Sequence, residues 1–304
     1  MSEPVVAALD RPLVRRSHSA LSDYWALTKP EVNFLIALTT VGAFLMASPA
    51  GPSHLPWTLL FHAVLGTVLV ASAAAALNQL IEMQFDRQMR RTARRPLASG
   101  RLEPSHALWF GTSLCLLGIV DLVLYTNIRV ALLAIFTFLS YLFLYTPLKR
   151  VTPLCTCVGA IPGAVPVLMG WAAARSRFDL EAWVLYAVLF FWQFPHFMAI
   201  AWMYREDYAR AGYLVLPSGQ LRKRFVTWQT VVAALALIPI GLIPTLKGST
   251  APICSAAVFL LGAIFLYYSA RFAFRSSTGS ARQLLMASIL YLPVLFVLLI
   301  LSRT

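Results

Sequence analysis

Long apolar segments, each near the length that crosses a bilayer as a helix, alternate along the chain with short polar segments. They fall at about residues 32–48, 57–80, 106–125, 129–146, 154–174, 181–203, 226–245, 252–271 and 284–302. Because lipid offers an unpaired backbone no hydrogen-bond partner, each segment is predicted to be an α-helix. The pattern predicts an all-α polytopic membrane protein with nine transmembrane helices in a single bundle.

Composition supports a membrane protein. Of the 304 residues, 59% are hydrophobic and 12% are charged, about half the charged share of an ordinary soluble protein. Pro162 and Pro166 lie inside the fifth segment and Pro195 inside the sixth, where proline kinks a helix that its neighbours hold. The four cysteines lie in predicted spans without nearby histidines, so we expect buried thiols and no zinc site.

The basic residues predict the orientation of the bundle. With a cytoplasmic N-terminus, 20 of the 25 Lys and Arg residues lie on cytoplasmic segments, as the positive-inside rule describes, and nine spans place the C-terminus outside. We attribute the net charge of +13 to topology and to contact with the lipid bilayer, and predict no nucleic-acid partner. Residues 1–28 are expected to be a disordered basic tail, and residues 29–304 a single membrane-embedded domain.

The stretch NQLIEMQFDRQMRRTARRPL, from Asn78 to Leu97, places two acids and five arginines at the end of the second span. Asn78, Glu82 and Asp86 stand four residues apart, so they project from one side of a helix. Their oxygen atoms suit Mg²⁺, which is commonly held by one or two carboxylates together with substrate phosphates. Arginine side chains that bind phosphate oxygens follow directly: Arg90, Arg91, Arg94 and Arg95. The stretch predicts a site for Mg²⁺ and a diphosphate.

An ordinary helix end is the alternative interpretation of this stretch. An arginine run at a cytoplasmic helix end is equally typical of the positive-inside rule, and for the arginines that alternative stays open. Acids at the membrane boundary are costly to bury and are usually functional, which favours the metal interpretation for the acid ladder Asn78, Glu82 and Asp86.

A second charged segment, YREDYARAGYLVLP, follows the sixth span. Asp207 is its expected metal-side or phosphate-side ligand, with Glu206 as a companion and Arg205 and Arg210 on either side. Two acidic helix ends that face each other could clamp a diphosphate and stabilise it as it leaves.

These motifs resemble those of a known family. The nine spans, the N-x-x-x-[DE]-x-x-x-D ladder after the second and the acidic motif after the sixth resemble the UbiA superfamily of intramembrane prenyltransferases. Within it, the chain is most similar to the members that farnesylate heme, in four stretches: NQLIEMQFDRQMRRTARRPL, YTPLKRVTPLCTCVGAIPGAVPVLMGW, WQFPHFMAIAWMYREDYARAG and LYLPVLF. Glu82 stands where many relatives carry Asp, and the second motif lacks the two widely spaced aspartates of quinone-pathway relatives.

The resemblance implies a reaction and a set of partners. Farnesyl diphosphate would give its prenyl group to a vinyl group of heme B, forming heme O and releasing diphosphate, with Mg²⁺ as cofactor. The catalytic and metal-side residues would be Asn78, Glu82, Asp86 and Asp207. The diphosphate would bind to Arg91, Arg95, Lys149, Arg150 and Arg205. A heme A synthase or an oxidase assembly factor would take the product.

The acceptor site is predicted around the sixth span. His196 lies in WQFPHF, and neutral imidazole is a good axial ligand to heme iron. A histidine bonded to a neighbouring helix is the alternative. Trp192, one turn earlier, would line the same porphyrin pocket. Lys149 and Arg150 could bind diphosphate, bind a heme propionate or serve as topology anchors.

Two other functions fit part of the pattern. An aromatic prenyltransferase of quinone or lipid biosynthesis would share the diphosphate machinery. A transporter would also carry acids and prolines in its membrane helices, but it needs polar groups along its length, and here they gather at one face. We therefore predict an enzyme that farnesylates heme. The short N-terminal tail favours a bacterial plasma (inner) membrane over a mitochondrial inner membrane.

Overall fold

The computed structural model describes residues 19–48, 55–219, 221–246 and 251–302. Across these ranges every regular element is a helix. Nine of the described helical segments are long and apolar enough to cross a membrane. The structure therefore confirms the all-α class and the number of spans predicted from the hydrophobic pattern.

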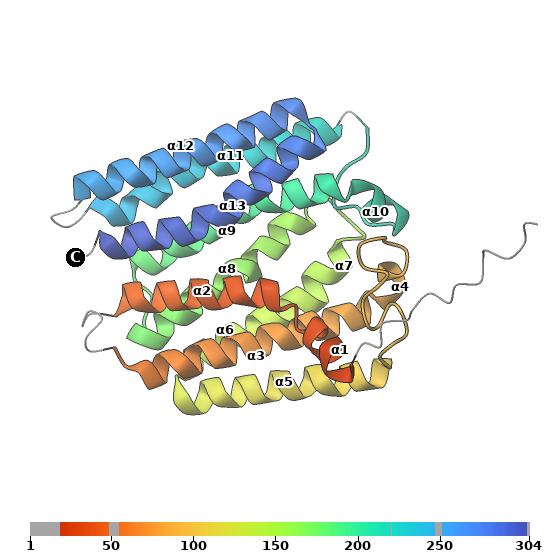
Figure 1. Cartoon of the computed structure of the whole chain (residues 1–304). Helices are drawn as coiled ribbons and strands as arrows, with labels where there is room; N and C mark the ends of the chain where they lie inside the picture. Colours follow the sequence, from red (N-terminus) through yellow and green to blue (C-terminus); the bar gives the residue numbers. More distant parts are fainter. Residues whose placement is uncertain (1–18, 49–54, 220, 247–250, 303–304) are drawn as a thin grey trace, which may run out of the picture.

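The spanning segments follow one another with short connections. In chain order they are α2 (Pro30–Ala47), α3 (Trp57–Ile81), α5 (Pro104–Tyr125), α6 (Ile128–Leu139) continued by the π-helix η2 (Ser140–Tyr145) and α7 (Thr146–Leu148), α8 (Cys155–Arg175), α9 (Leu180–Met203), α11 (Leu221–Leu242) continued by the 3₁₀-helix η3 (Ile243–Leu246), α12 (Ala251–Arg275) and α13 (Thr278–Leu301). Three short helices, α1 (Ala20–Leu27), α4 (Met83–Asp86) and α10 (Arg205–Arg210), gather at one end of the bundle (Figure 1).

Some boundaries differ from those expected. The seventh and ninth spans begin at Leu221 and Thr278, earlier than predicted, because polar first turns continue the helices beyond their apolar stretches. Ser277 caps the last helix through a reciprocal pair with Ser280. Residues 20–27 form helix α1, capped by Ser19, where a disordered tail was predicted. Residues 1–18 of that expected tail lie outside the described residues.

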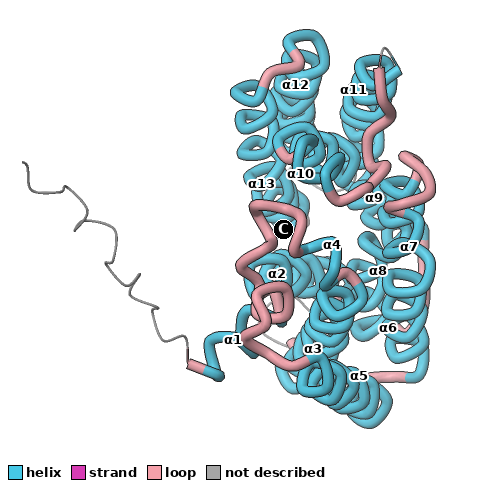
Figure 2. The backbone as a smooth tube through the Cα atoms, turned by 90° about the vertical axis from the view of Figure 1, so that its right-hand side faces the viewer, coloured by secondary structure: helices cyan, strands magenta, loops and turns pink. Residues whose placement is uncertain are grey.

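The helices pack side by side around the middle of the molecule. α3 runs along α5, α2 along α8, and α11 along α12, while α9 joins α8, α11 and α13. Seen from the end that carries α4 and α10, the two short helices and their loops lie over the ends of the surrounding helices (Figure 2). α1 lies at this end and the end of α13 at the opposite one (Figure 1), as an odd number of spans requires. That this end of the bundle faces the cytoplasm stays a prediction.

Small residues allow the closest helix contacts. A Cβ added at Gly170 of α8 would collide with the Thr40 carbonyl of α2, and one at Gly118 of α5 would lie 2.9 Å from the Gly66 carbonyl oxygen of α3. In membranes such close approach replaces the hydrophobic driving force between helices.

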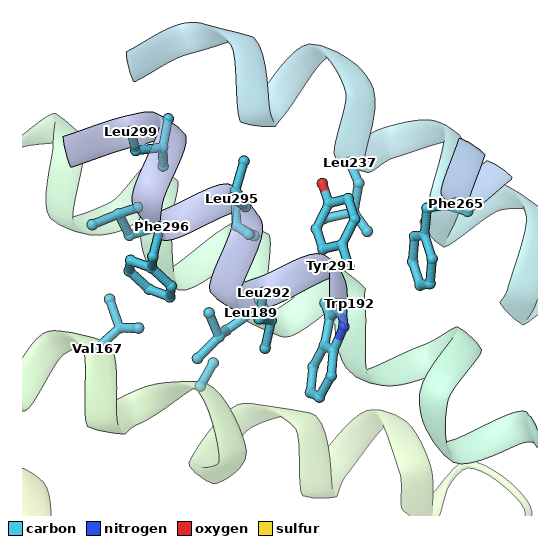
Figure 3. Packing of buried hydrophobic residues seen from close by; sticks show 14 of the residues in the cluster. Val167, Leu189, Trp192, Leu237, Phe265, Tyr291, Leu292, Leu295, Phe296 and Leu299 are labelled. Carbon is cyan, nitrogen blue, oxygen red and sulfur yellow. The ribbon is translucent and has the colours of Figure 1, made fainter. Parts of the chain in front are cut away.

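The largest core cluster fixes α9 in the bundle. Tyr291, Leu292 and Leu295 of α13 are buried beside Trp192 and Leu189 of α9 (Figure 3). Because α9 leads directly into α10, this packing sets the position of the second charged segment.

Candidate active site

The predicted acid ladder spans a helix break. α3 ends at Ile81, and Glu82 has backbone angles of −91° and 4° before α4 begins. The backbone bonds from Glu82 N to the Asn78 carbonyl and from Asp86 N to the Glu82 carbonyl, both 2.9 Å, keep the four-residue spacing across the break. All three ladder residues are buried, with exposed fractions of 1% for Asn78, 6% for Glu82 and 1% for Asp86.

Basic side chains from different parts of the chain contact two of the three ladder residues. Lys149 Nζ lies 2.9 Å from Glu82 Oε1, and Lys29 Nζ donates to Asn78 Oδ1 at 3.3 Å. These contacts join the ladder to the end of α7 and the start of α2.

The third ladder contact is local. Arg95 Nη1 lies 2.7 Å from Asp86 Oδ2, so the loop after α4 folds back on its own acid. The Thr92 hydroxyl also donates to the Asp86 carbonyl at 3.0 Å. Arg95 is therefore held at the ladder, and its role as a diphosphate ligand stays a prediction.

Electrostatics couple these groups strongly. Burial by itself would raise the pKa of the Glu82 carboxyl, but the charge and hydrogen bond of Lys149, with the charge of Lys29, lower that pKa below its ordinary value. Burial would likewise lower the pKa of Lys149, yet the Glu82 carboxylate raises it well above its ordinary value. Burial, and then repulsion by Arg95 and Lys149, lower the pKa of Lys29 to about 7. The basic groups therefore repel one another while they attract the acids.

The second charged segment faces the first. Asp207 is buried on α10, and its Oδ2 accepts from the Arg91 backbone N–H at 3.3 Å. The Arg91 guanidinium lies 4.4 Å from the ring centre of Tyr204 and donates to the Tyr208 hydroxyl at 3.1 Å. Arg210 bonds both the Asp207 carboxylate and the Gln88 carbonyl. The two acidic segments therefore meet, as the prediction required.

Tyr213 belongs to the second charged segment and packs against the first. Gly212, with a φ of +71°, turns the chain after α10. The ring of Tyr213, the next residue, packs with Phe85 of α4 and Tyr208 of α10. The side chain is 5% exposed, and its hydroxyl lies beside the Glu82 carboxylate. Burial and the nearby Glu82 carboxylate raise the pKa of this hydroxyl, so it stays protonated.

The donor atoms suit Mg²⁺ bound together with a phosphate ligand. Within the part of the chain that the structure describes, no three His, Cys, Asp or Glu side chains gather as a preformed metal site. Asp86 Oδ1, however, is buried without a partner. Asp86 Oδ2, Glu82 Oε1 and Asn78 Oδ1 contact Arg95, Lys149 and Lys29, cations that a diphosphate could take over. Mg²⁺ usually binds one or two carboxylates plus substrate phosphates, so these residues fit it.

Two predicted diphosphate residues lie outside this network. The Arg150 guanidinium is exposed and lies 4.3 Å from the ring centre of Phe85. Arg205 donates to the Trp202 carbonyl at 3.0 Å and lies 3.5 Å from Glu206. Neither contacts the ladder acids in the described structure.

The predicted heme-side residues lie on α9, bonded to α13. His196 Nδ1 is 2.8 Å from the Ser288 hydroxyl, and Trp192 Nε1 donates to the Ser288 carbonyl at 2.8 Å. The two rings stack with centres 4.7 Å apart. His196 is thus bonded to a neighbouring helix, as the alternative stated, while its Nε2 has no partner among the residues described here.

Three site residues escaped the sequence analysis. Lys29 belongs to no quoted motif, whereas Thr146 and Tyr213 lie inside the stretches YTPLKRVTPL and YREDYARAGYLVLP without having been given a role. Lys29 sits in the left-handed region at φ 51° before Pro30, a conformation that a lysine holds only when its surroundings impose it. Thr146 follows the π-helical turn η2 and accepts from Asn78 Nδ2 at 3.0 Å. Single π-helical turns are frequent at functional sites, and could not be predicted from apolar periodicity.

A bundle of membrane helices with a buried acid–cation network at one end is the architecture of an intramembrane enzyme that handles a polyanionic substrate. The model of the UbiA prenyltransferase family matches residues 35–298, and the chain belongs to this family. Family membership decides against the transporter alternative.

Curated relatives are similar over nearly the whole chain. A protoheme IX farnesyltransferase of Solibacter usitatus is 45% identical, covering 93% of this chain and 99% of the relative. One of Koribacter versatilis is 43% identical, covering 98% of this chain and 97% of the relative. One of Salinibacter ruber is 38% identical, covering 92% of this chain and 98% of the relative.

Solved structures share the fold. A digeranylgeranylglyceryl phosphate synthase superposes with a TM-score of 0.71 at 18% identity, covering 93% of this chain and 98% of its own. A UbiA homolog from Archaeoglobus fulgidus bound to GPP and Mg²⁺ superposes with a TM-score of 0.64 at 14% identity, covering 91% and 99%.

Proposed function

We propose that this protein transfers the farnesyl group of farnesyl diphosphate to a vinyl group of heme B, giving heme O and diphosphate. The relatives named protoheme IX farnesyltransferase, at 45% and 43% identity over almost the full chain, support this substrate pair. The aromatic-acceptor alternative has no comparable support among them.

One observation carries the proposal. Glu82 and Asp86 are buried at the end of an apolar bundle, each in contact with a cation, and the loop that follows them is bonded to Asp207 of the second charged segment. Such a cluster is costly without a ligand and becomes useful when a polyanion joins it.

The reaction breaks the bond between the allylic carbon and the diphosphate oxygen, and the electron pair leaves with diphosphate. The vinyl π electrons of the acceptor then form the new carbon–carbon bond. Water adds to the cation beside the porphyrin ring and loses a proton, which leaves the hydroxyethylfarnesyl side chain. Atoms balance as farnesyl diphosphate, heme B and water giving heme O and diphosphate.

The basic residues of the chain would stabilise the leaving group. Lys149, Lys29 and Arg95 contact the ladder, and Arg91 lies beside Tyr204 and Tyr208 of the second segment, so these cations require little rearrangement as charge develops on the diphosphate. Arg150 and Arg205 would act farther out, at the rim. The apolar bundle would keep water from the carbocation until the carbon–carbon bond has formed.

Mg²⁺ would neutralise diphosphate charge when bound. Asn78, Glu82, Asp86 and Asp207 would hold it, through the ladder oxygens and the acid of α10. The Archaeoglobus fulgidus homolog bound to GPP and Mg²⁺ supports this use of the fold.

The acceptor would lie beside α9. Trp192 offers a ring face, and the Nε2 atom of His196 is available to heme iron while Ser288 holds Nδ1. We further propose that residues 29–304 form one membrane-embedded domain in a bacterial plasma membrane. A heme A synthase or an oxidase assembly factor would receive the product.

Incubation of the purified protein with heme B, farnesyl diphosphate and Mg²⁺, followed by mass spectrometry of the extracted heme, tests the function. The proposal expects heme carrying one farnesyl group and one added water. Unchanged heme, from a protein that still binds farnesyl diphosphate, would refute it.

A further inference from the structure

A hollow lies on the opposite side of α9 from His196. It has a volume of about 710 Å³ and is lined by the start of α8, the middle of α9 and the first half of α11, a size typical of small-molecule sites. We name it the α11 groove. Phe190 and Phe194 line it from α9, and at 100° per residue they project about 180° away from Trp192 and His196.

Helix contacts separate the α11 groove from the bundle interior. Gln193 donates to the Ala160 carbonyl of α8 at 3.1 Å, and the buried Phe194 packs with Ala160 and Ala233. These contacts of α9 with α8 and α11 lie between the α11 groove and the His196 side of α9.

One polar group lies inside this otherwise apolar groove. Gln229 is 8% exposed, and its Nε2 lies 3.8 Å from Cys157 Sγ while its Oε1 is buried without a partner. The amide nitrogen Nε2 carries two N–H groups, of which one is directed at Cys157 Sγ, so the second is left for a ligand carbonyl.

The mouth of the groove is basic. Arg224 lines it and is exposed, without an acidic partner among the described residues. Lys223 is exposed beside it, and Arg222 donates to the Pro217 carbonyl at 3.0 Å. Arg224 and Gln229 are five residues apart, which is about 7.5 Å along a helix. A phosphate and an ester carbonyl of one lipid are separated by a similar span.

We propose that the α11 groove binds an anionic glycerophospholipid of the surrounding bilayer. Its phosphate would pair with Arg224, an ester carbonyl would accept from the Gln229 amide, and an acyl chain would lie against Phe190, Phe194 and Trp228. Basic residues beside a membrane helix attract anionic lipids electrostatically, and the buried amide adds a contact that a plain apolar surface lacks.

Quenching of Trp228 by brominated lipids tests the proposal. The full-length protein is placed in phosphatidylcholine vesicles that contain a small share of either brominated phosphatidylglycerol or brominated phosphatidylcholine. The difference between the native protein and Trp228→Phe isolates this tryptophan from the other seven. Trp109, 71% exposed on α5, is isolated in the same way by Trp109→Phe as the control.

The proposal expects an apparent affinity for the anionic lipid about fivefold higher than for phosphatidylcholine at Trp228, and no preference at Trp109. Arg224→Gln should abolish the preference. Gln229→Leu, which leaves the charge unchanged, should lower the apparent affinity of both lipids at Trp228. Equal quenching by the two lipids in the native protein would overturn the proposal. So would a lower heme B affinity of Arg224→Gln, because the groove would then serve the acceptor.

Discussion

The ammonium of Lys149 and the carboxylate of Glu82 lie 2.9 Å apart although 67 residues separate them in the chain. The contact joins the end of α7 to the break between α3 and α4. Both groups are withdrawn from solvent, with side-chain exposures of 13% and 8%. A pair of this kind is weak evidence for stability and better evidence for a site, because its desolvation is costly.

Lys149→Gln should lower kcat/KM for farnesyl diphosphate about 100-fold, the usual effect of removing one donor from a developing anion. Arg150→Gln is the matched control, because Arg150 is the next residue and points its charge at Phe85. We expect that control to change the rate about twofold or less. Steady-state kinetics with heme B in excess measures kcat/KM for both variants. Similar losses in the two variants would mean that Lys149 and Arg150 serve together as a topology anchor.

Asp207→Asn should reduce turnover by about two orders of magnitude, since it removes an acid from the second segment while keeping its shape. Glu206→Gln should leave turnover nearly unchanged, because the Glu206 side chain is 77% exposed. Normal turnover of the Asp207 variant would show that α10 contributes structure alone. Membrane yield and thermal stability confirm that both variants fold.

Tyr213→Phe should raise the Mg²⁺ concentration for half-maximal activity about tenfold, as expected for a residue that orients a metal ligand. The ring and its packing on Phe85 stay in place, so only the hydroxyl beside Glu82 is lost. Tyr291→Phe is the control, because its hydroxyl is buried in the α13 core, beside the acceptor side of α9 and not among the ladder residues. An unchanged Mg²⁺ requirement in Tyr213→Phe would remove this residue from the account.

His196→Ala should weaken heme B binding by more than about tenfold and leave farnesyl diphosphate binding close to normal. Ser288→Ala should give a smaller effect, since it releases Nδ1 but keeps the imidazole. Absorbance titration with heme B and a binding assay with farnesyl diphosphate measure the two affinities. Equal loss of both would mean that His196 holds α9 to α13 and nothing more.

Local pattern predicted the fold and the spacing of the acid ladder. Apolar stretches of membrane length gave the spans, and the four-residue spacing of Asn78, Glu82 and Asp86 holds across the helix break. The partners could not be predicted, because Lys29 and Thr146 reach Asn78 over 49 and 68 residues. Such distances depend on how the helices pack.

The basic residues show the same limit. Arg91, Arg95, Arg150 and Arg205 look alike in the sequence, each being an arginine at a helix end. Only packing distinguishes the first two, which lie within the network, from Arg150 on Phe85 and Arg205 on Trp202.

Metal binding in the presence of a substrate analogue tests the central claim most directly. Mn²⁺ takes the same oxygen ligands as Mg²⁺ and is detected by electron paramagnetic resonance. With an unreactive farnesyl thiodiphosphate, the native protein should bind Mn²⁺ tightly. Asp86→Asn and Asp207→Asn should each weaken that binding by at least about tenfold. Native-like Mn²⁺ affinity in both variants, with the protein folded, would contradict a diphosphate site built from the two charged segments.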